Sequence, residues 1–295
     1  MRRATVVPLR AGRSAPSRDE RRLRPVKVVA VTGGKGGVGK TSLCANLALA
    51  LATTQRRVMV LDGDLGLASV NLMFGIQSEA TLRDVVRGTH TLAEIVIRGP
   101  AGIRIVPGSS GFLEMTRLSS HEHAGIVRAF GDLERDLDLL LVDTAPGISD
   151  SVLQFAGAAH YPLIVVCDEP ASIADAYAIV KLLVKERGAR AIAVVTNQTR
   201  AEQGRALFAR FERIVARFLP VALTHAGNIP YDERMTRSIR CRQPIVTAYP
   251  RSPAALALKH LAERIDAWPT RTEVRGDLEF FVERLLPSKV GGVAQ

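Results

Sequence analysis

The sequence has few aromatic residues, few cysteines and no long apolar run. Aromatic residues make up 5% of the 295 residues, with a single Trp, which argues against a nucleic-acid surface built on stacked rings. The cysteines Cys44, Cys167 and Cys241 are odd in number and widely spaced, and no Cys-x-x-Cys occurs, so we expect free thiols in a reducing compartment. The N-terminal charges are followed by no apolar stretch, and no run approaches the roughly 18 apolar residues of a membrane span. We therefore expect a cytoplasmic protein.

The positive charge of the chain is concentrated at its N-terminus. The formal net charge is +11, but residues 1–27 hold nine basic and two acidic residues, which leaves only +4 for the other 268. Residues 1–25 are rich in Arg, Ser, Pro and Ala without periodicity, and we predict a disordered basic leader. This arm either touches phosphates or anionic lipid or only solubilises the chain. The folded body is not expected to bind nucleic acid.

Short aliphatic runs alternate with longer amphipathic segments from residue 26 onward. Most runs are apolar throughout, as strands buried on both faces of a parallel sheet are. This alternation predicts an α/β fold with a doubly wound, mostly parallel sheet. The predicted strands are Val26–Thr32, Arg57–Leu61, Ile103–Pro107, Leu139–Asp143, Leu163–Cys167, Ala191–Thr196 and Val221–Ala226, and the helices include Lys40–Thr53, Ala171–Glu186, Ala201–Phe218 and Ser252–Trp268.

The strongest motif lies between the first predicted strand and the first helix. Gly34-x-x-x-x-Gly39-Lys40-Thr41 matches the Walker A pattern, whose backbone N–H groups cradle phosphate at a helix N-terminus. Lys40 is expected to reach the β- and γ-phosphates of ATP, and the Thr41 hydroxyl to ligate Mg²⁺. The loop residues predicted to bind nucleotide are Gly34, Lys35, Gly36, Gly37, Val38, Gly39, Lys40, Thr41 and Ser42.

Acidic residues end two of the predicted strands. Asp143 closes the apolar run that begins at Leu139. A carboxylate at the end of a buried strand beside a phosphate-binding loop is a Walker B aspartate, which holds a magnesium-bound water. Asp62 and Asp64 lie at the end of the second strand. We predict a Mg²⁺ site formed by Thr41, Asp62 and Asp143, partly through water.

The additional lysine of the loop, Lys35, identifies a family resemblance. Lys35-Gly-Gly-Val-Gly-Lys40-Thr41 resembles the deviant Walker A motif of the MinD/ParA superfamily of P-loop ATPases. In that family the first lysine crosses a dimer interface to the partner's nucleotide, which implies that Lys35 couples ATP binding to homodimerisation. A local phosphate contact is the alternative. Asp62-Gly-Asp64 resembles the family's switch motif, which implies that Asp64, together with Lys35 and Lys40, takes part in slow ATP hydrolysis by positioning water.

The resemblance also implies contacts to the adenosine part of ATP. Asn197 closes the predicted strand Ala191–Thr196, where MinD-like proteins place an Asn against adenine, and Pro230 and Asp232 match a loop that packs on the ring. Glu169 is expected to meet the partner's nucleotide across the dimer. Asn after a strand is also a common turn residue.

Four segments are similar to the FlhG (FleN/YlxH) family of flagellar-number ATPases. Proteins that bridge an iron–sulfur cluster are set aside, because no cysteines are suitably placed. The similarity covers about Val26 to Trp268, which we take as an ATPase domain over residues 26–269. The four segments are Leu61–Gly75, Ile105–Gly111, Cys167–Tyr177 and Ala248–Ala255.

FlhG-type proteins imply three partners: the GTPase FlhF, flagellar C-ring proteins and, in some bacteria, a flagellar transcription activator. The leader departs from the family, because Ser17–Arg24 does not align with the N-terminal element that stimulates FlhF. The alternatives are a ParA-like DNA-partition ATPase, a MinD-like division-site ATPase and a metabolic P-loop phosphotransferase.

Residues 270–295 form a tail with one predicted amphipathic helix over residues 277–286. Leu278, Phe281, Val282 and Leu285 fall at i, i+3, i+4 and i+7, which places them on one face. MinD and FlhG relatives end in such a helix, which lies in the membrane interface and implies reversible membrane association. The helix carries more acidic than basic residues, which does not favour anionic lipid. The rival prediction is a helix that docks on the protein's own surface.

Overall fold

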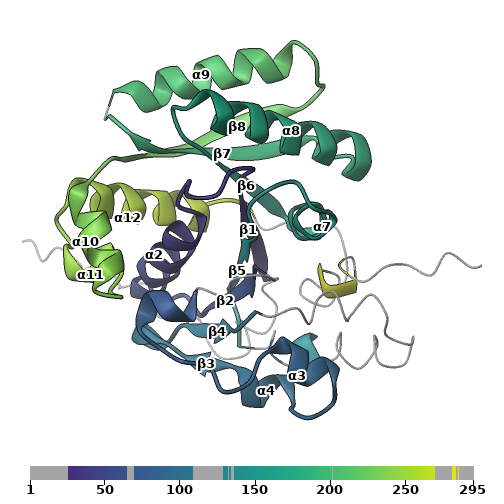
Figure 1. Cartoon of the computed structure of the whole chain (residues 1–295), viewed down its shortest axis with the longest axis vertical. Coiled ribbons are helices and arrows are strands. Elements are labelled where there is room, and N and C mark those ends of the chain that lie inside the picture. Colours follow the sequence, from purple (N-terminus) through teal and green to yellow (C-terminus); the bar gives the residue numbers. More distant parts are fainter. Residues whose placement is uncertain are drawn as a thin grey trace, which may run out of the picture.

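A computed structural model describes residues 26–64, 70–108, 129–131, 133, 136–200, 202–269, 281–283 and 285. The predicted leader, residues 1–25, and most of the predicted tail lie outside the described residues. Figure 1 shows a central sheet with helices packed on both of its faces.

The described strands form one sheet in the order β3-β4-β2-β5-β1-β6-β7-β8. Every pair is parallel except β3 with β4, which confirms the doubly wound, mostly parallel sheet. The strands are β1 (Lys27–Thr32), β2 (Val58–Gly63), β3 (Ile97–Arg98), β4 (Arg104–Val106), β5 (Leu139–Thr144), β6 (Tyr161–Val166), β7 (Ala191–Thr199) and β8 (Ala222–Pro230).

The central strands are apolar because helices cover both faces of the sheet. Every residue of β1, β2 and β5 is buried, as expected for parallel strands of this kind. The pairing of β2 with β5 sets Asp62 directly opposite Asp143. The carboxyl ends of these strands therefore bring two acidic residues together, at the edge of the sheet where open α/β folds bind ligands.

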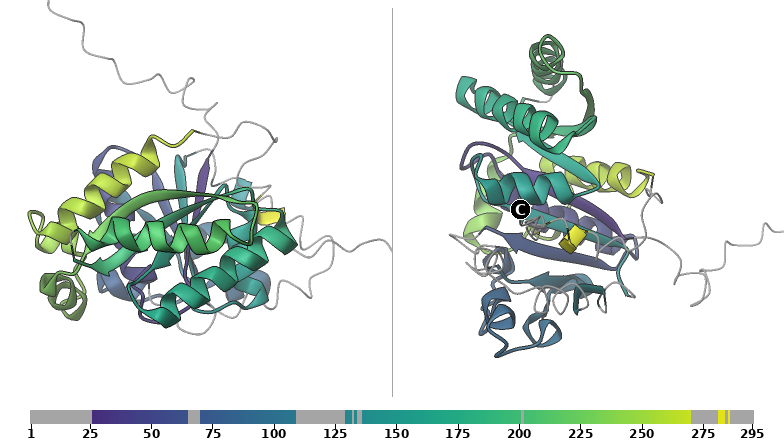
Figure 2. Two further views of the ribbon diagram at one scale, coloured as in Figure 1. Left: turned by 90° about the horizontal axis from the view of Figure 1, so that it is seen from above. Right: turned by 90° about the vertical axis from the view of Figure 1, so that its right-hand side faces the viewer.

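Two helical layers sandwich the sheet, as the two views in Figure 2 also show. On one face α2, α11 and α12 pack on alternate residues of β1 such as Val29 and Val31. On the other face α7 packs on β1, and apolar side chains of α3, α4, α8 and α9 belong to the same buried cluster as Val28 and Ala30. The helices are α2 (Lys40–Thr53), α3 (Leu82–Val86), α4 (Leu92–Ile95), α7 (Asp150–Ala158), α8 (Pro170–Arg187), α9 (Gln203–Ala216), α10 (Glu233–Arg240), α11 (Ile245–Ala248) and α12 (Pro253–Asp266), with 3₁₀ turns η1 (Asn71–Phe74) and η2 (Pro100–Gly102).

The ends of β7 and β8 differ from the prediction. β7 continues to Thr199, so Asn197 lies inside the strand and does not close it. β8 likewise runs to Pro230. The two strands stay paired to these ends across a register irregularity between Asn197 and Thr199, where Gln198 lies in the left-handed region at φ 55°.

The described part of the C-terminal helix packs on the body of the protein. Phe281–Glu283 and Leu285 are helical. Phe281, Val282 and Leu285 are almost fully buried in the apolar cluster that also holds α7, α8 and α9. This agrees with the prediction of a helix docked on the protein's own surface, while Leu278 lies outside the described residues. No described helix has the length and apolar character needed to cross a membrane.

Candidate nucleotide-binding site

The loop between β1 and α2 is shaped to receive an anion. Gly39 caps α2 with a φ of 93°, and no side chain caps the helix start. The N–H groups of the first helical turn, which have no partner within a helix, therefore face the loop. Because these groups carry the positive end of the helix dipole, the loop offers a phosphate both hydrogen bonds and a favourable field.

Two glycines of the loop are needed for close contacts. A Cβ on Gly34 would stand 2.4 Å from the Cβ of Asp175 in α8, and a Cβ on Gly39 would stand 2.5 Å from the Asn197 amide nitrogen. Larger residues at either position would push the loop away from α8 or β7. The glycine pattern therefore sets where the loop lies, in addition to its ability to curl.

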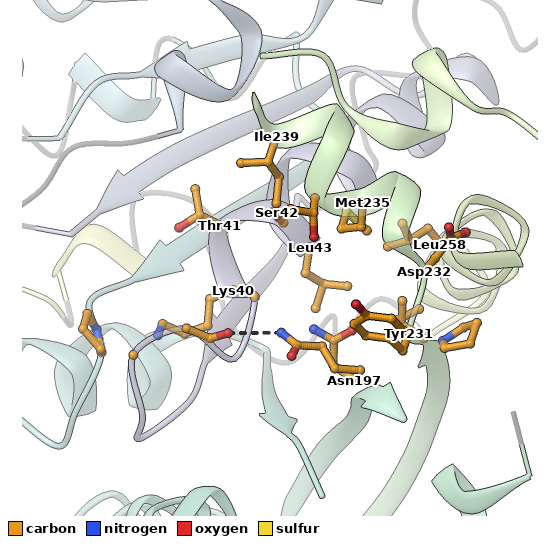
Figure 3. A pocket seen from close by; sticks show the side chains of 18 of the residues that line it. Lys40, Thr41, Ser42, Leu43, Asn197, Tyr231, Asp232, Met235, Ile239 and Leu258 are labelled. Atoms are coloured by element: carbon orange, nitrogen blue, oxygen red, sulfur yellow. Dashed lines mark hydrogen bonds between the residues drawn. The ribbon is translucent and has the colours of Figure 1, made fainter. Parts of the chain in front are cut away.

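A cavity of about 520 Å³ opens beside the loop. Lys40, Thr41, Ser42 and Asp64 line one end of it. Further from Lys40 the lining becomes largely apolar. Figure 3 shows Met235 of α10 and Leu258 of α12 on the side of Asp232, with Tyr231 near Asn197. Ile239 of α10 lies beside Thr41 and Ser42. A polar end beside a phosphate loop and an apolar slot beyond it match the two halves of a nucleotide.

Lys40 is held inside this site. Its side chain is 6% exposed, and its ammonium donates to the Lys35 carbonyl at 3.4 Å. Burial lowers the pKa of Lys40, while Asp143 and Asp64 favour its charged form. A buried ammonium aimed at a phosphate loop is a strong partner for a polyphosphate, because few waters compete for it.

The Asp143 carboxylate fits a Mg²⁺ ion. It is fully buried, and neither oxygen has a hydrogen-bond partner of good geometry among the described residues. Burial raises the pKa of Asp143 to about 8, although the nearby Thr41 hydroxyl and Lys40 ammonium act against the rise. No three His, Cys, Asp or Glu side chains in the described chain converge on one point. This suits Mg²⁺, which is usually held by one or two carboxylates together with substrate phosphates and water.

Asp62 and Asp64 have different environments. Asp62 is fully buried and accepts hydrogen bonds from the backbone N–H groups of Val70, at 3.0 Å, and Asp64, at 3.1 Å. It therefore holds the backbone of Asp64 and Val70, and it lies beside Asp143 without lining the cavity. Asp64 lines the cavity, as a residue that positions water must.

Asn197 and Gln198 fasten the phosphate loop to β7. The Asn197 amide donates to the Val38 carbonyl at 2.7 Å, and the Gln198 amide donates to the Gly37 carbonyl at 3.1 Å. Asn197 thus supports the loop, and it also lines the cavity with Pro230 and Asp232. The Asp232 side chain caps α10 by accepting from Arg234 N–H at 3.0 Å.

Lys35 lies outside the cavity and forms an ion pair with Glu169, which precedes α8. The hydrogen bond to Glu169 and its charge raise the pKa of Lys35. Two lysines of one loop thus face different surroundings: Lys40 lines its own chain's cavity, whereas Lys35 is 42% exposed.

Most of the predicted site residues gather around one cavity. Gly34, Lys35, Val38, Asp62, Asp143 and Glu169 stand behind or beside it. Several apolar residues that line the cavity were not predicted from the sequence. The i, i+4 spacing of Met235 and Ile239 in an otherwise polar helix is a signal that could have found two of them. The lining residues that were not predicted are Leu43, Thr144, Pro146, Gln198, Ile229, Tyr231, Met235, Thr236, Ile239 and Leu258.

The fold and this site define a P-loop nucleotide-binding protein. Residues 29–245 match the family model described as the CobQ/CobB/MinD/ParA nucleotide binding domain, and the chain belongs to that family. MinD and ParA proteins of the family are P-loop ATPases.

The relatives narrow the family further. The chain is 50% identical over 273 residues to the antiactivator FleN of Pseudomonas aeruginosa, covering 92% of this chain and 98% of FleN. It is 30% identical to the flagellum site-determining protein YlxH of Helicobacter pylori, covering 74% of each chain. Among solved structures, the MinD cell division protein of Aquifex aeolicus has the same fold, with a TM-score of 0.66, 23% identity, and coverage of 83% of this chain and 100% of that one.

Proposed function

We propose that this protein is a slow Mg-ATPase that switches between monomer and ATP-bound dimer and thereby regulates flagellar number and placement. The observation that carries the proposal is the separation of the two loop lysines. Lys40 lines the cavity of its own chain, while Lys35 stands outside it. A lysine of the phosphate loop that does not reach its own nucleotide cavity is available to a second molecule.

We propose a role in hydrolysis for each of these groups. The N–H groups of the loop and Lys40 hold the phosphates and stabilise the charge that develops on them. Asp64 positions a water that attacks the γ-phosphorus, the bond from that phosphorus to the bridging oxygen breaks, and ADP and phosphate leave. The apolar end with Met235 and Leu258 receives the base.

Thr41 and Asp143 are the groups that would hold Mg²⁺, with Asp62 beside them. When bound, the ion supplies positive charge that neutralises the phosphate oxygens. Asp143 must lose its proton for this role, and a cation held at this buried carboxylate would favour that loss.

The partners follow from the relatives and the fold. The antiactivator activity in the name of FleN supports a flagellar transcription activator as one partner. The name of YlxH, a flagellum site-determining protein, supports a role at the site of the flagellum, where we propose flagellar C-ring proteins and an FlhF-type GTPase as the other partners. Two subunits would close with the phosphate loops face to face, each Lys35 leaving Glu169 for the partner's nucleotide.

The C-terminal helix gives the switch an output. Phe281, Val282 and Leu285 are buried on the body, so their apolar face is not offered to lipid in the single chain. We propose that the ATP dimer releases this helix and that two copies then bind membrane together. Each copy alone binds weakly, and pairing raises its effective concentration at the surface.

Flagellar counts in the source bacterium test the function. A strain lacking the gene is expected to carry an altered number or placement of flagella, and the wild-type gene should restore them. Lys40→Ala, which loses the phosphate contact, should fail to restore them, whereas Arg213→Ala, an exposed change remote from the cavity, should succeed. Normal flagella in the deletion strain would refute the proposal.

A further inference from the structure

Among the described strands β8 forms one edge of the sheet, and a polar hollow that the nucleotide site does not use lies at this edge. β8 is the last strand in the sheet order, and among the described strands it pairs with β7 alone. A cavity of about 720 Å³ lies at this edge. It shares no residue with the nucleotide cavity. Its lining is Glu202, Arg205, His225, Gly227, Asn228 and Arg264.

The backbone of β8 offers hydrogen-bonding groups toward this hollow. The Ala222 N–H donates to the Arg190 carbonyl at 3.0 Å and so points toward β7, whose first residue, Ala191, pairs with Ala222. Because successive residues of a strand alternate in direction, Leu223 and His225 present their N–H and C=O groups to the open edge. The His225 carbonyl agrees with this, since it accepts from the Arg264 guanidinium at 2.9 Å.

Two guanidinium groups flank the edge from opposite faces of the sheet. Arg205 belongs to α9, which packs on one face, and Arg264 belongs to α12, which packs on the other. Neither forms an ion pair within the described part of the chain. Both positive charges act on the His225 ring. Burial lowers the pKa of His225 most, and the charges of Arg264 and Arg205 lower it further.

The charges indicate what the edge can bind. An unpaired edge strand is a template for an extended chain. The residues of an added strand point alternately to the two faces, so two adjacent acidic residues would meet Arg264 on one face and Arg205 on the other. The chain's own leader is strongly basic. A second β8 would bring up the same excess of positive charge, since Arg205 and Arg264 outnumber the one carboxylate of the hollow, Glu202. Like charges disfavour both of those occupants.

We propose that the β8 edge binds an extended acidic segment of a partner protein as an added strand, with adjacent carboxylates on Arg205 and Arg264. In the free protein Arg264 donates a hydrogen bond to the His225 carbonyl. It thereby protects the edge from unspecific strand pairing, as charged side chains on edge strands do. The incoming backbone N–H takes that carbonyl, and the released guanidinium pairs with a carboxylate. Bidentate pairing of Arg with carboxylate gives both strength and direction.

A labelled peptide tests the proposal on the full chain. The probe is a fluorescein-labelled eight-residue peptide of Val and Thr with a central Glu-Asp pair, followed by anisotropy. We expect saturable binding with a Kd below about 1 mM. Arg264→Ala and Arg205→Ala should each weaken it about five- to tenfold. Arg213→Ala, which removes an exposed α9 charge that donates to the Ala209 carbonyl, should leave it unchanged.

Backbone pairing is tested separately from charge. A peptide with the same side chains but N-methyl groups on alternate residues should not bind, and the parent peptide should slow hydrogen exchange at Leu223 and His225. No saturable binding, equal binding of a peptide with Lys in place of Glu and Asp, or equal binding of the N-methylated peptide would overturn the proposal. The proposal would also be overturned if a short DNA duplex bound to the protein, lost its binding in Arg205→Ala and Arg264→Ala, and were not displaced by the peptide. The nucleotide cavity takes no part, so failure here leaves the ATP switch untouched.

Discussion

Lys35 and Glu169 form an ion pair within a single chain. In the proposed switch, the lysine that would reach the partner's nucleotide is therefore held in the single chain by a carboxylate at the start of α8. The adjoining Gly34 packs on Asp175 of the same helix, so the front of the phosphate loop and the first turns of α8 form one unit. Dimerisation must break the pair before Lys35 can reach another molecule.

Glu169→Gln is expected to strengthen the ATP dimer. Without the carboxylate, Lys35 is free to leave, and because the pair is exposed the dissociation constant should fall only a few-fold. Sedimentation velocity over a protein concentration series with ATP measures it. Asp168→Asn, which removes the neighbouring pair with Arg210, is the matched control. A weaker dimer would contradict this and would place Glu169 on the partner's nucleotide, as the family resemblance implies.

The nucleotide-free protein should lose stability as pH rises, in a way that depends on Asp143. The folded pKa of about 8 lies above the unfolded value of about 4. The folded state therefore keeps a proton that the unfolded chain releases. This contribution is full below about pH 4 and is lost as pH rises through about 8. Chemical unfolding between pH 5 and pH 9 should show a shallower fall for Asp143→Asn, with exposed Asp136→Asn as control. Identical slopes would disprove the assignment.

Asn197→Ala should distinguish support of the loop from recognition of adenine. Its amide holds the Val38 carbonyl, so loss of the side chain should weaken phosphate binding for every nucleotide. We expect ATP and GTP affinities to fall by a similar factor, up to about tenfold for one lost buried hydrogen bond. Fluorescence titration with labelled nucleotides measures both. A loss confined to ATP would show that Asn197 reads the base instead.

Phe281→Asp should prevent the C-terminal helix from binding lipid. Phe281 is 1% exposed, and a charge at this position disfavours an apolar site of either kind, on the body or in a membrane. In flotation with vesicles, wild-type protein should float with ATP and stay in solution with ADP, while Phe281→Asp stays in solution with both. Glu283→Gln, on an exposed position of the same helix, should behave as wild type. Equal flotation of Phe281→Asp would remove the helix from the account.

The nucleotide loop and the buried sheet follow from local sequence patterns. The helix Lys40–Thr53 was predicted with the observed ends, because a glycine loop and an apolar run define it within a few residues. The short helices α3 and α4 were missed. Each begins at a capping box, Thr81 with Asp84 and Thr91 with Glu94, but has only one turn of pattern for a prediction to use.

Contacts between segments far apart in the chain could not be predicted from the sequence. The pairing of Asp62 with Asp143 depends on strand order, and the hold of Asn197 on the Val38 carbonyl depends on the irregular end of β7. The ion pair of Lys35 with Glu169 could not be predicted from the sequence either. The family resemblance implies that both residues meet the partner's nucleotide, whereas their pairing with each other arises from the packing of the loop on α8.

The molar mass in solution with each nucleotide tests the switch most directly. Light scattering should give 31.9 kDa for wild type with ADP and twice that mass with ATP. Asp64→Ala, which keeps the phosphate contacts but loses the group that positions water, should stay at the doubled mass after wild type has returned to monomer. Lys40→Ala should remain a monomer with either nucleotide. A monomeric Asp64→Ala at saturating ATP would contradict the nucleotide-gated dimer.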